Sequence, residues 1–206
     1  MIGNDVVDLA DPETMPSATH PRFDERVFAA EELASLARSR AGTRLRWMLW
    51  AAKESAFKAA KKLDPATIFA PRRMIVRLAC DGSGSVSVGE RAFSLRVLLD
   101  GEVCHAVACA AVPAGALIVS GLRRLGPCDL TGTAPIDPRR AVRRLAIGAL
   151  APWLGVKVRD LTFIRDGRVP RLRWRGRLAP VDVSLSHHGR FVAFAGALDP
   201  RGPSER

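Results

Sequence analysis

Apolar and polar positions divide the chain into two rounds, each with a helix followed by strands. In the first round the pattern predicts a strand over residues 2–9, a helix over residues 23–40 and a second helix over residues 43–62. Gly and Asp turn signals then separate four strand-like segments, which cover residues 72–80, 83–90, 92–101 and 102–112.

The second round follows a stretch rich in Gly, Pro and Thr, residues 121–138, which indicates a linker. It predicts a helix over residues 138–154 and then strands over residues 160–165, 171–176, 180–186 and 190–198. Both rounds end on an Ala/Val-rich strand, "HAVACAAV" and "FVAFAGAL". We therefore expect an α+β fold of two tandem, similar subdomains, residues 1–120 and 139–206.

The helix "WAAKESAFKAAKK" carries charges on one side. Glu54, Lys58 and Lys61 fall at i, i+4 and i+7, opposite a narrow stripe of alanines. Glu followed by Lys at i+4 is the favourable order for an exposed pair, so a solvated ladder is one interpretation. A site that holds a metal and a phosphate is the other.

Two strands carry further candidates. In the strand over residues 2–9, Asp5 and Val7 share one face and Asp8 takes the other, so Asp5 is either a turn cap or a half-buried carboxylate that needs a cation. In "VDVSLSHHGRF" the strict alternation indicates a half-buried strand that ends on Ser186 and His187. Its end is either structural or an anion pocket.

Composition and charge limit the function classes. The 206 residues are 48% hydrophobic, which predicts a folded chain, and the formal net charge is +11. Such a charge suits nucleic acid, small polyphosphates or an acidic protein, but with no tyrosine and 6% aromatics, stacking on single strands is disfavoured. The four cysteines are expected to be free thiols. The chain lacks a membrane-length apolar run and a signal-peptide pattern, so we expect it to be cytoplasmic.

Five segments together resemble the 4′-phosphopantetheinyl transferase superfamily: "IGNDVVDL", "RVFAAEEL", "WAAKESAFK", "DGRVPRL" and "VSLSHHGRF". The most specific is "LWAAKESAFK", which is similar to the family's W-x-x-K-E-[SA]-x-x-K helix. The motif order is that of the short holo-acyl-carrier-protein synthases, whereas the length suggests two subdomains. The resemblance therefore implies a permuted pseudo-dimer with its site between the halves.

The resemblance also implies a reaction, the transfer of phosphopantetheine from coenzyme A to a carrier-protein serine with release of 3′,5′-ADP. Asp5 and Glu54 match the carboxylates that bind Mg²⁺, and Glu54 is also placed to accept the serine proton. Lys58 would neutralise charge on the phosphates. Ser186 and His187 match residues that contact the coenzyme A phosphates. The implied partners are coenzyme A and an acidic acyl or peptidyl carrier protein, with no membrane and no nucleic acid.

The chain departs from the family pattern at several positions. Val7 stands where two-subdomain members carry a second acidic residue, and this leaves open whether Asp8 joins the metal site. Leu49 replaces an arginine of the short synthases, and Ala29 stands where a capping Ser or Thr is expected. Two alternatives therefore remain: an inactive homologue that binds coenzyme A or a carrier protein, and a basic nucleic-acid-binding protein.

Overall fold

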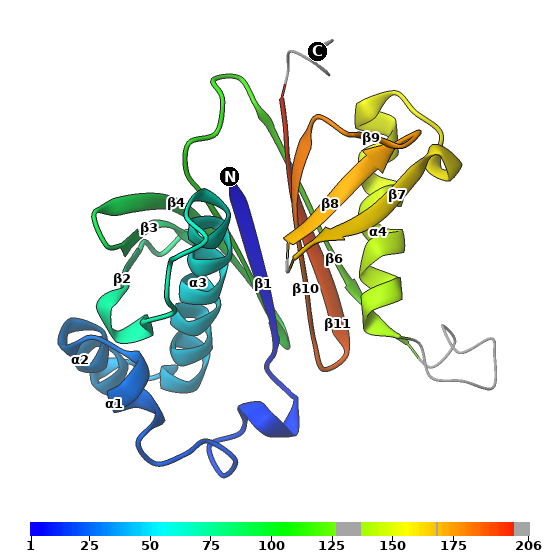
Figure 1. Ribbon diagram of the computed structural model, residues 1–206. Helices are drawn as coiled ribbons and strands as arrows, with labels where there is room; N and C mark the ends of the chain where they lie inside the picture. The colour runs from blue at the N-terminus through cyan, green and yellow to red at the C-terminus, as the bar shows by residue number, and fades with distance from the viewer. Residues whose placement is uncertain (127–136, 168, 200–206) are drawn as a thin grey trace.

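The chain is arranged in four layers, with a helix, a five-stranded sheet, a three-stranded sheet and a second helix in succession (Figure 1). The computed structural model describes residues 1–126, 137–167 and 169–199. The elements of the first part are β1 (Ile2–Asp8), η1 (Pro12–Thr14), α1 (Phe23–Val27), α2 (Ala30–Arg38), α3 (Gly42–Leu63), η2 (Pro71–Arg73), β2 (Ile75–Leu78), β3 (Ser83–Val88), β4 (Arg91–Asp100) and β5 (Val103–Cys109).

The second part contains β6 (Leu117–Arg124), α4 (Pro138–Leu154), η4 (Val158–Asp160), β7 (Leu161–Asp166), β8 (Val169–Trp174), β9 (Arg177–Leu178), β10 (Val181–His188) and β11 (Phe191–Leu198). The first sheet has the order β1-β5-β4-β3-β2, and the second has the order β10-β11-β6. A small sheet of β7, β8 and β9 lies beside the second sheet. The mixed α+β class predicted from the sequence is confirmed.

Strand β1 separates the two parts of the molecule because its two faces pack against different layers. Val7 belongs to the core that β1, β4 and β5 form with α3, whereas Val6 packs with Phe191 and Ala193 of β11. This is the alternation expected of an extended strand. On the far face of β11, Val192 and Phe194 belong to a separate core under α4.

The helix predicted over residues 23–40 is interrupted. It consists of α1 and α2, and the extended residue Phe28 lies between them with none of its surface exposed. Ala29 begins α2 without a side-chain cap, as expected, but its N–H donates to Glu32 Oε2 at 2.8 Å. The break is therefore associated with the burial of one aromatic side chain.

Strand β6 crosses the boundary expected at residue 120. It pairs with β11 from Leu117 to Arg124, so it belongs to the second sheet, whereas its residues were assigned partly to the first subdomain and partly to the linker. Of the expected linker, residues 127–136 lie outside the described residues.

Two further expectations concern the cysteines and the membrane. Cys80, Cys104 and Cys109 are free thiols, and Cys104 is fully buried in the core around α3; Cys128 lies outside the described residues. Across residues 1–126, 137–167 and 169–199, no helix combines the length and the apolar character needed to cross a bilayer.

Candidate functional site

A close approach between β1 and α3 brings the first group of candidate residues together. A Cβ atom on Gly3 would lie 2.0 Å from Ser55 O and 2.8 Å from Ala59 N, so only glycine permits this packing. Two positions further along β1, on the same face, is Asp5. The glycine of the "GND" segment therefore sets how near Asp5 comes to α3.

Lys58 pairs with Asp5 rather than forming a ladder with Glu54. Its Nζ atom donates to Asp5 Oδ1 at 2.7 Å and to Asn4 O at 3.1 Å. Lys61 instead donates to Thr67 O at 2.8 Å. The solvated ladder considered from the sequence is therefore wrong, because both lysines are engaged with other segments.

Glu54 lies half-buried beside this pair. Its carboxylate makes no hydrogen bond or ion pair with another side chain or backbone group of the described chain. Burial raises the pKa of its carboxyl, and the negative charge of Asp5 raises it further, while Lys58 opposes the shift. A half-buried carboxyl beside a second carboxylate is a donor set that a divalent cation would stabilise. The residues present therefore fit a hard cation such as Mg²⁺.

Neither Val7 nor Asp8 adds a third carboxylate to the Asp5–Glu54 pair. Val7 is buried in the core under α3. Asp8 lies on the opposite face of β1, where its two carboxylate oxygens accept hydrogen bonds of 2.7 Å each from the Arg190 guanidinium. Asp8 is therefore held by an arginine and lies away from the Asp5–Glu54 pair.

The lysine next to Glu54 in the family motif has a structural role that sequence analysis missed. Lys53 is fully buried, and its Nζ atom donates to Glu32 Oε2 at 2.6 Å and to the carbonyls of Pro71 and Met74. Glu32 also accepts from Val76 N at 3.0 Å. This charge therefore joins α2, α3 and the start of β2, and satisfies the requirement that a buried ion be paired.

Ser186 and His187 lie on opposite faces of β10. The Ser186 hydroxyl is buried and accepts a hydrogen bond of 2.9 Å from Asn4 Nδ2. His187 points away from β1 and lines a cavity of about 310 Å³. Burial lowers the pKa of its imidazole, as do the positive charges of Arg139 and Lys58. A bound anion would act in the opposite direction.

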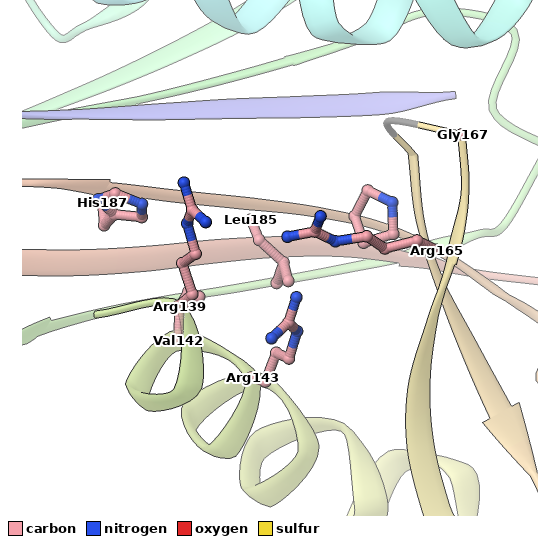
Figure 2. Close-up of a pocket in the computed structure, with 8 residues that line it drawn as sticks. Arg139, Val142, Arg143, Arg165, Gly167, Leu185 and His187 are labelled. Carbon is pink, nitrogen blue, oxygen red and sulfur yellow. The ribbon is translucent and has the colours of Figure 1, made fainter. Parts of the chain in front are cut away.

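The cavity beside His187 is lined by three arginines that sequence analysis did not select. Arg139 and Arg143 are one turn apart on α4, and Arg165 comes from β7. Figure 2 shows the guanidinium group of Arg139 between His187 and Leu185, and those of Arg143 and Arg165 beside Leu185. The i, i+4 spacing in "PRRAVRR" was a visible signal, but the approach of β7 was not, so this set was hidden by the fold. The arrangement is typical of a site for a phosphate-bearing ligand.

A second cavity, of about 260 Å³, joins the two groups of residues. It is lined by Lys58, Lys61 and Lys62 of α3, and it shares Pro170 and Leu185 with the arginine cavity. The two cavities therefore have a common wall. A line of positive side chains extends from α3 to α4, across the boundary between the two parts of the chain.

Asp11, Glu13 and His188 form another group whose donor atoms lie within 4.8 Å of one another. Asp11 Oδ1 already accepts from Glu13 N at 2.9 Å, and His188 Nδ1 accepts from Asp8 N at 3.2 Å. These atoms serve the local backbone, so the group offers few free ligands.

Comparison with known proteins adds three findings. The sequence profile described as the 4′-phosphopantetheinyl transferase superfamily matches residues 1–111, which is more than half of the chain. No curated protein matches at a significant level. The crystal structure of holo-[acyl-carrier-protein] synthase from Thermotoga maritima is similar with a TM-score of 0.39 and 17% identity, over 52% of this chain and 60% of that one, so the match spans less than two thirds of the synthase. By the extent of the profile match, the chain belongs to the 4′-phosphopantetheinyl transferase superfamily.

Proposed function

We propose that the protein transfers 4′-phosphopantetheine from coenzyme A to a serine of an apo carrier protein. The observation that carries this proposal is that adjoining cavities connect a group of carboxylates with a group of arginines. A carboxylate pair with Lys58 lies at one end, and an arginine cavity lies at the other. Family membership supplies the reaction class.

The arginine cavity would hold the adenosine end of coenzyme A. Arg139, Arg143 and Arg165 line it, and among the described residues that line it there is no carboxylate. Guanidinium groups suit the 3′-phosphate because they donate paired hydrogen bonds and stay charged. The neutral His187 would gain a proton as the phosphate arrives, which adds a fourth donor at the rim.

In the reaction, the carrier serine oxygen forms a bond to the phosphorus that bears the pantetheine arm. The bond from this phosphorus to 3′,5′-ADP breaks, and the nucleotide leaves with the electron pair. Glu54 accepts the serine proton, because its half-buried carboxylate lies beside Asp5 and Lys58 and has no other partner among the described residues. Lys58 places positive charge beside the phosphates, where transfer needs it most.

Asp5 and Glu54 are the side chains that would hold Mg²⁺. When bound, this ion would withdraw charge from the diphosphate and so favour loss of the nucleotide. Lys58 already fixes Asp5 through Oδ1, so the orientation of this ligand is set before a cation arrives.

A direct test incubates an apo carrier protein with coenzyme A, Mg²⁺ and this protein. Mass spectrometry should show the carrier gaining one phosphopantetheine arm, and the gain should require Mg²⁺. An unmodified carrier, across carriers from fatty-acid, polyketide and peptide synthesis, would contradict the proposal.

The arginine cavity has a matched control on its own helix. Arg143→Ala should raise the KM for coenzyme A on the order of tenfold, because it removes one charge-assisted phosphate contact. Arg144→Ala removes an equal charge from an exposed position that does not line the cavity, and should leave the KM nearly unchanged. Equal effects of the two substitutions would remove Arg143 from the ligand site.

The feature that favours an inactive homologue is Val7, which leaves two carboxylates instead of three. Such a protein would bind coenzyme A without modifying any carrier. Calorimetry with coenzyme A distinguishes it from the proposed enzyme, and a binding curve with a steep salt dependence on DNA would instead favour the nucleic-acid alternative.

A further inference from the structure

The outer edge of β1 is closed by side chains instead of by another strand. Two of its backbone N–H groups donate to side chains of β10, from Ile2 to Asp182 Oδ2 at 2.7 Å and from Asn4 to Ser184 Oγ at 3.0 Å. The N–H of Asp8 donates to His188 Nδ1, as already described. The polar side of β10, expected from its alternation to face solvent, is therefore directed into the molecule.

The carbonyl groups on the same edge are met by lysines of α3. Lys62 donates to Ile2 O at 2.7 Å and also to Asp182 Oδ1 at 2.8 Å. Lys58 donates to Asn4 O. The edge of β1 thus lies between α3 and β10, and its hydrogen bonds with Asp182, Ser184 and His188 of β10 join the two parts of the molecule.

Asn4 is the residue at which these contacts converge. It is fully buried, its backbone meets Lys58 and Ser184, and its side-chain Nδ2 donates to Ser186 Oγ. The same Nδ2 atom lies 3.2 Å from His105 Nε2. Burial, together with the charge of Lys58, lowers the pKa of His105 to about 4, so the imidazole stays neutral and accepts this hydrogen bond.

We propose that Ser186 acts on the reaction through Asn4, as a positioning residue, and makes no contact with coenzyme A. Its hydroxyl is directed at Asn4, on the face of β10 opposite His187, and it does not line the arginine cavity. By holding Asn4, it fixes the backbone beside Asp5 and the carbonyl that receives Lys58. It therefore sets the carboxylate end of the site relative to β10, the strand that carries His187.

This inference rests on the proposed function, and coenzyme A itself supplies the test. Dephospho-coenzyme A lacks only the 3′-phosphate, so the ratio of kcat/KM for the two substrates reports on contacts to that phosphate. Ser186→Ala should lower kcat on the order of tenfold with both substrates and leave the ratio unchanged. His187→Ala, at the cavity, should reduce the ratio.

A double-mutant cycle gives the second readout. If Ser186 acts through Asn4, then Ser186→Ala should cause little further loss in an Asn4→Ala background. Ser186→Thr, which keeps the hydroxyl, should retain most of the turnover. If Ser186→Ala does not fold, Ser186→Cys offers a similar shape with a weaker hydrogen-bonding group and takes its place.

A reduced substrate ratio in Ser186→Ala, or independent losses in the double variant, would overturn the proposal. Absence of transfer by the wild-type protein would instead contradict the proposed function. In that event, calorimetric affinities for the two coenzymes replace kcat/KM: an unchanged affinity ratio in Ser186→Ala supports the absence of a contact with the 3′-phosphate, and a reduced ratio overturns it.

Discussion

Glu54 has a charge that the surrounding fold does not compensate. Its carboxyl pKa is raised by burial and by Asp5, so the folded protein binds this proton more tightly than the unfolded chain does. At a pH above the ordinary pKa of glutamate, ionised Glu54 therefore lowers the stability of the folded state. A residue that is retained at such a cost is typical of a functional site.

Glu54→Gln should separate this role from a structural one. Without metal, the melting temperature should stay the same or rise, because the cost of ionisation is removed. Mg²⁺ should raise the melting temperature of the wild type more than that of the variant. Turnover should fall on the order of a hundredfold. Full turnover together with a wild-type response to Mg²⁺ would show that Glu54 is neither base nor ligand.

At the scale of elements, the contact between β1 and α3 determines where the site residues lie. Gly3→Ala should destabilise the fold and reduce turnover, because its Cβ would fall 2.0 Å from a helix carbonyl and force the two elements apart.

Gly148→Ala is the control for this prediction, because Gly148 is exposed in the middle of α4 with nothing near its Cβ position. This change should raise stability by about 0.5–1 kcal/mol. Chemical denaturation and turnover of both variants provide the comparison, and a neutral Gly3→Ala would show that the approach can relax.

The sequence predicted the helices and strands better than it predicted what they pack against. The helices at α3 and α4 and most strands were foreseen, because apolar periodicity reports directly on a buried face. Strand β6 was missed, because the stretch rich in Gly, Pro and Thr that starts at Gly121 was interpreted as a linker. In the structure the ring of Phe194 occupies the space where a side chain at Gly121 would lie, with Cε1 2.5 Å from the Cβ position. This glycine meets a packing requirement.

The site was foreseen only where one segment carried it. Glu54 and Lys58 share a helix with a specific pattern, and Asp5 follows the glycine that permits the close approach. The alternation in β10 showed that its two faces differ, but could not show that the polar face is covered by β1. Nor could it show that Arg165 of β7 would meet Arg139 of α4, because that contact depends on tertiary packing.

At the scale of the whole molecule, the Asp8–Arg190 pair joins the end of β1 to the turn between β10 and β11. Burial alone would raise the Asp8 pKa, but hydrogen bonds from Arg190 outweigh it and lower the pKa to about 2 from 3.8. Because the pKa of Asp8 is lower in the folded protein than in the unfolded chain, the pair stabilises the fold at any pH above the unfolded-state pKa. It is lost as the pH falls from about 4 towards 2.

Asp8→Asn should therefore lower the free energy of unfolding by about 2 kcal/mol at neutral pH. The difference from wild type should shrink as the pH approaches 2, where the wild-type carboxyl is itself protonated. Urea denaturation across this range measures both curves. Parallel curves would mean that the pair contributes nothing through its charge.

The closed edge of β1 affects the tendency of variants of this protein to aggregate. An unpaired strand edge is a template on which other chains can add strands, and here Asp182 and Ser184 occupy the N–H groups that would recruit them. Ser186 differs, because its hydroxyl accepts from the side chain of Asn4 and donates to Ala193 O of β11, and meets no backbone group of β1. Substitutions at Asp182 or Ser184 therefore leave an N–H group of β1 without its partner, and molecules in which β1 separates from β10 would offer this edge to other chains, so aggregation during expression would precede any loss of catalytic chemistry.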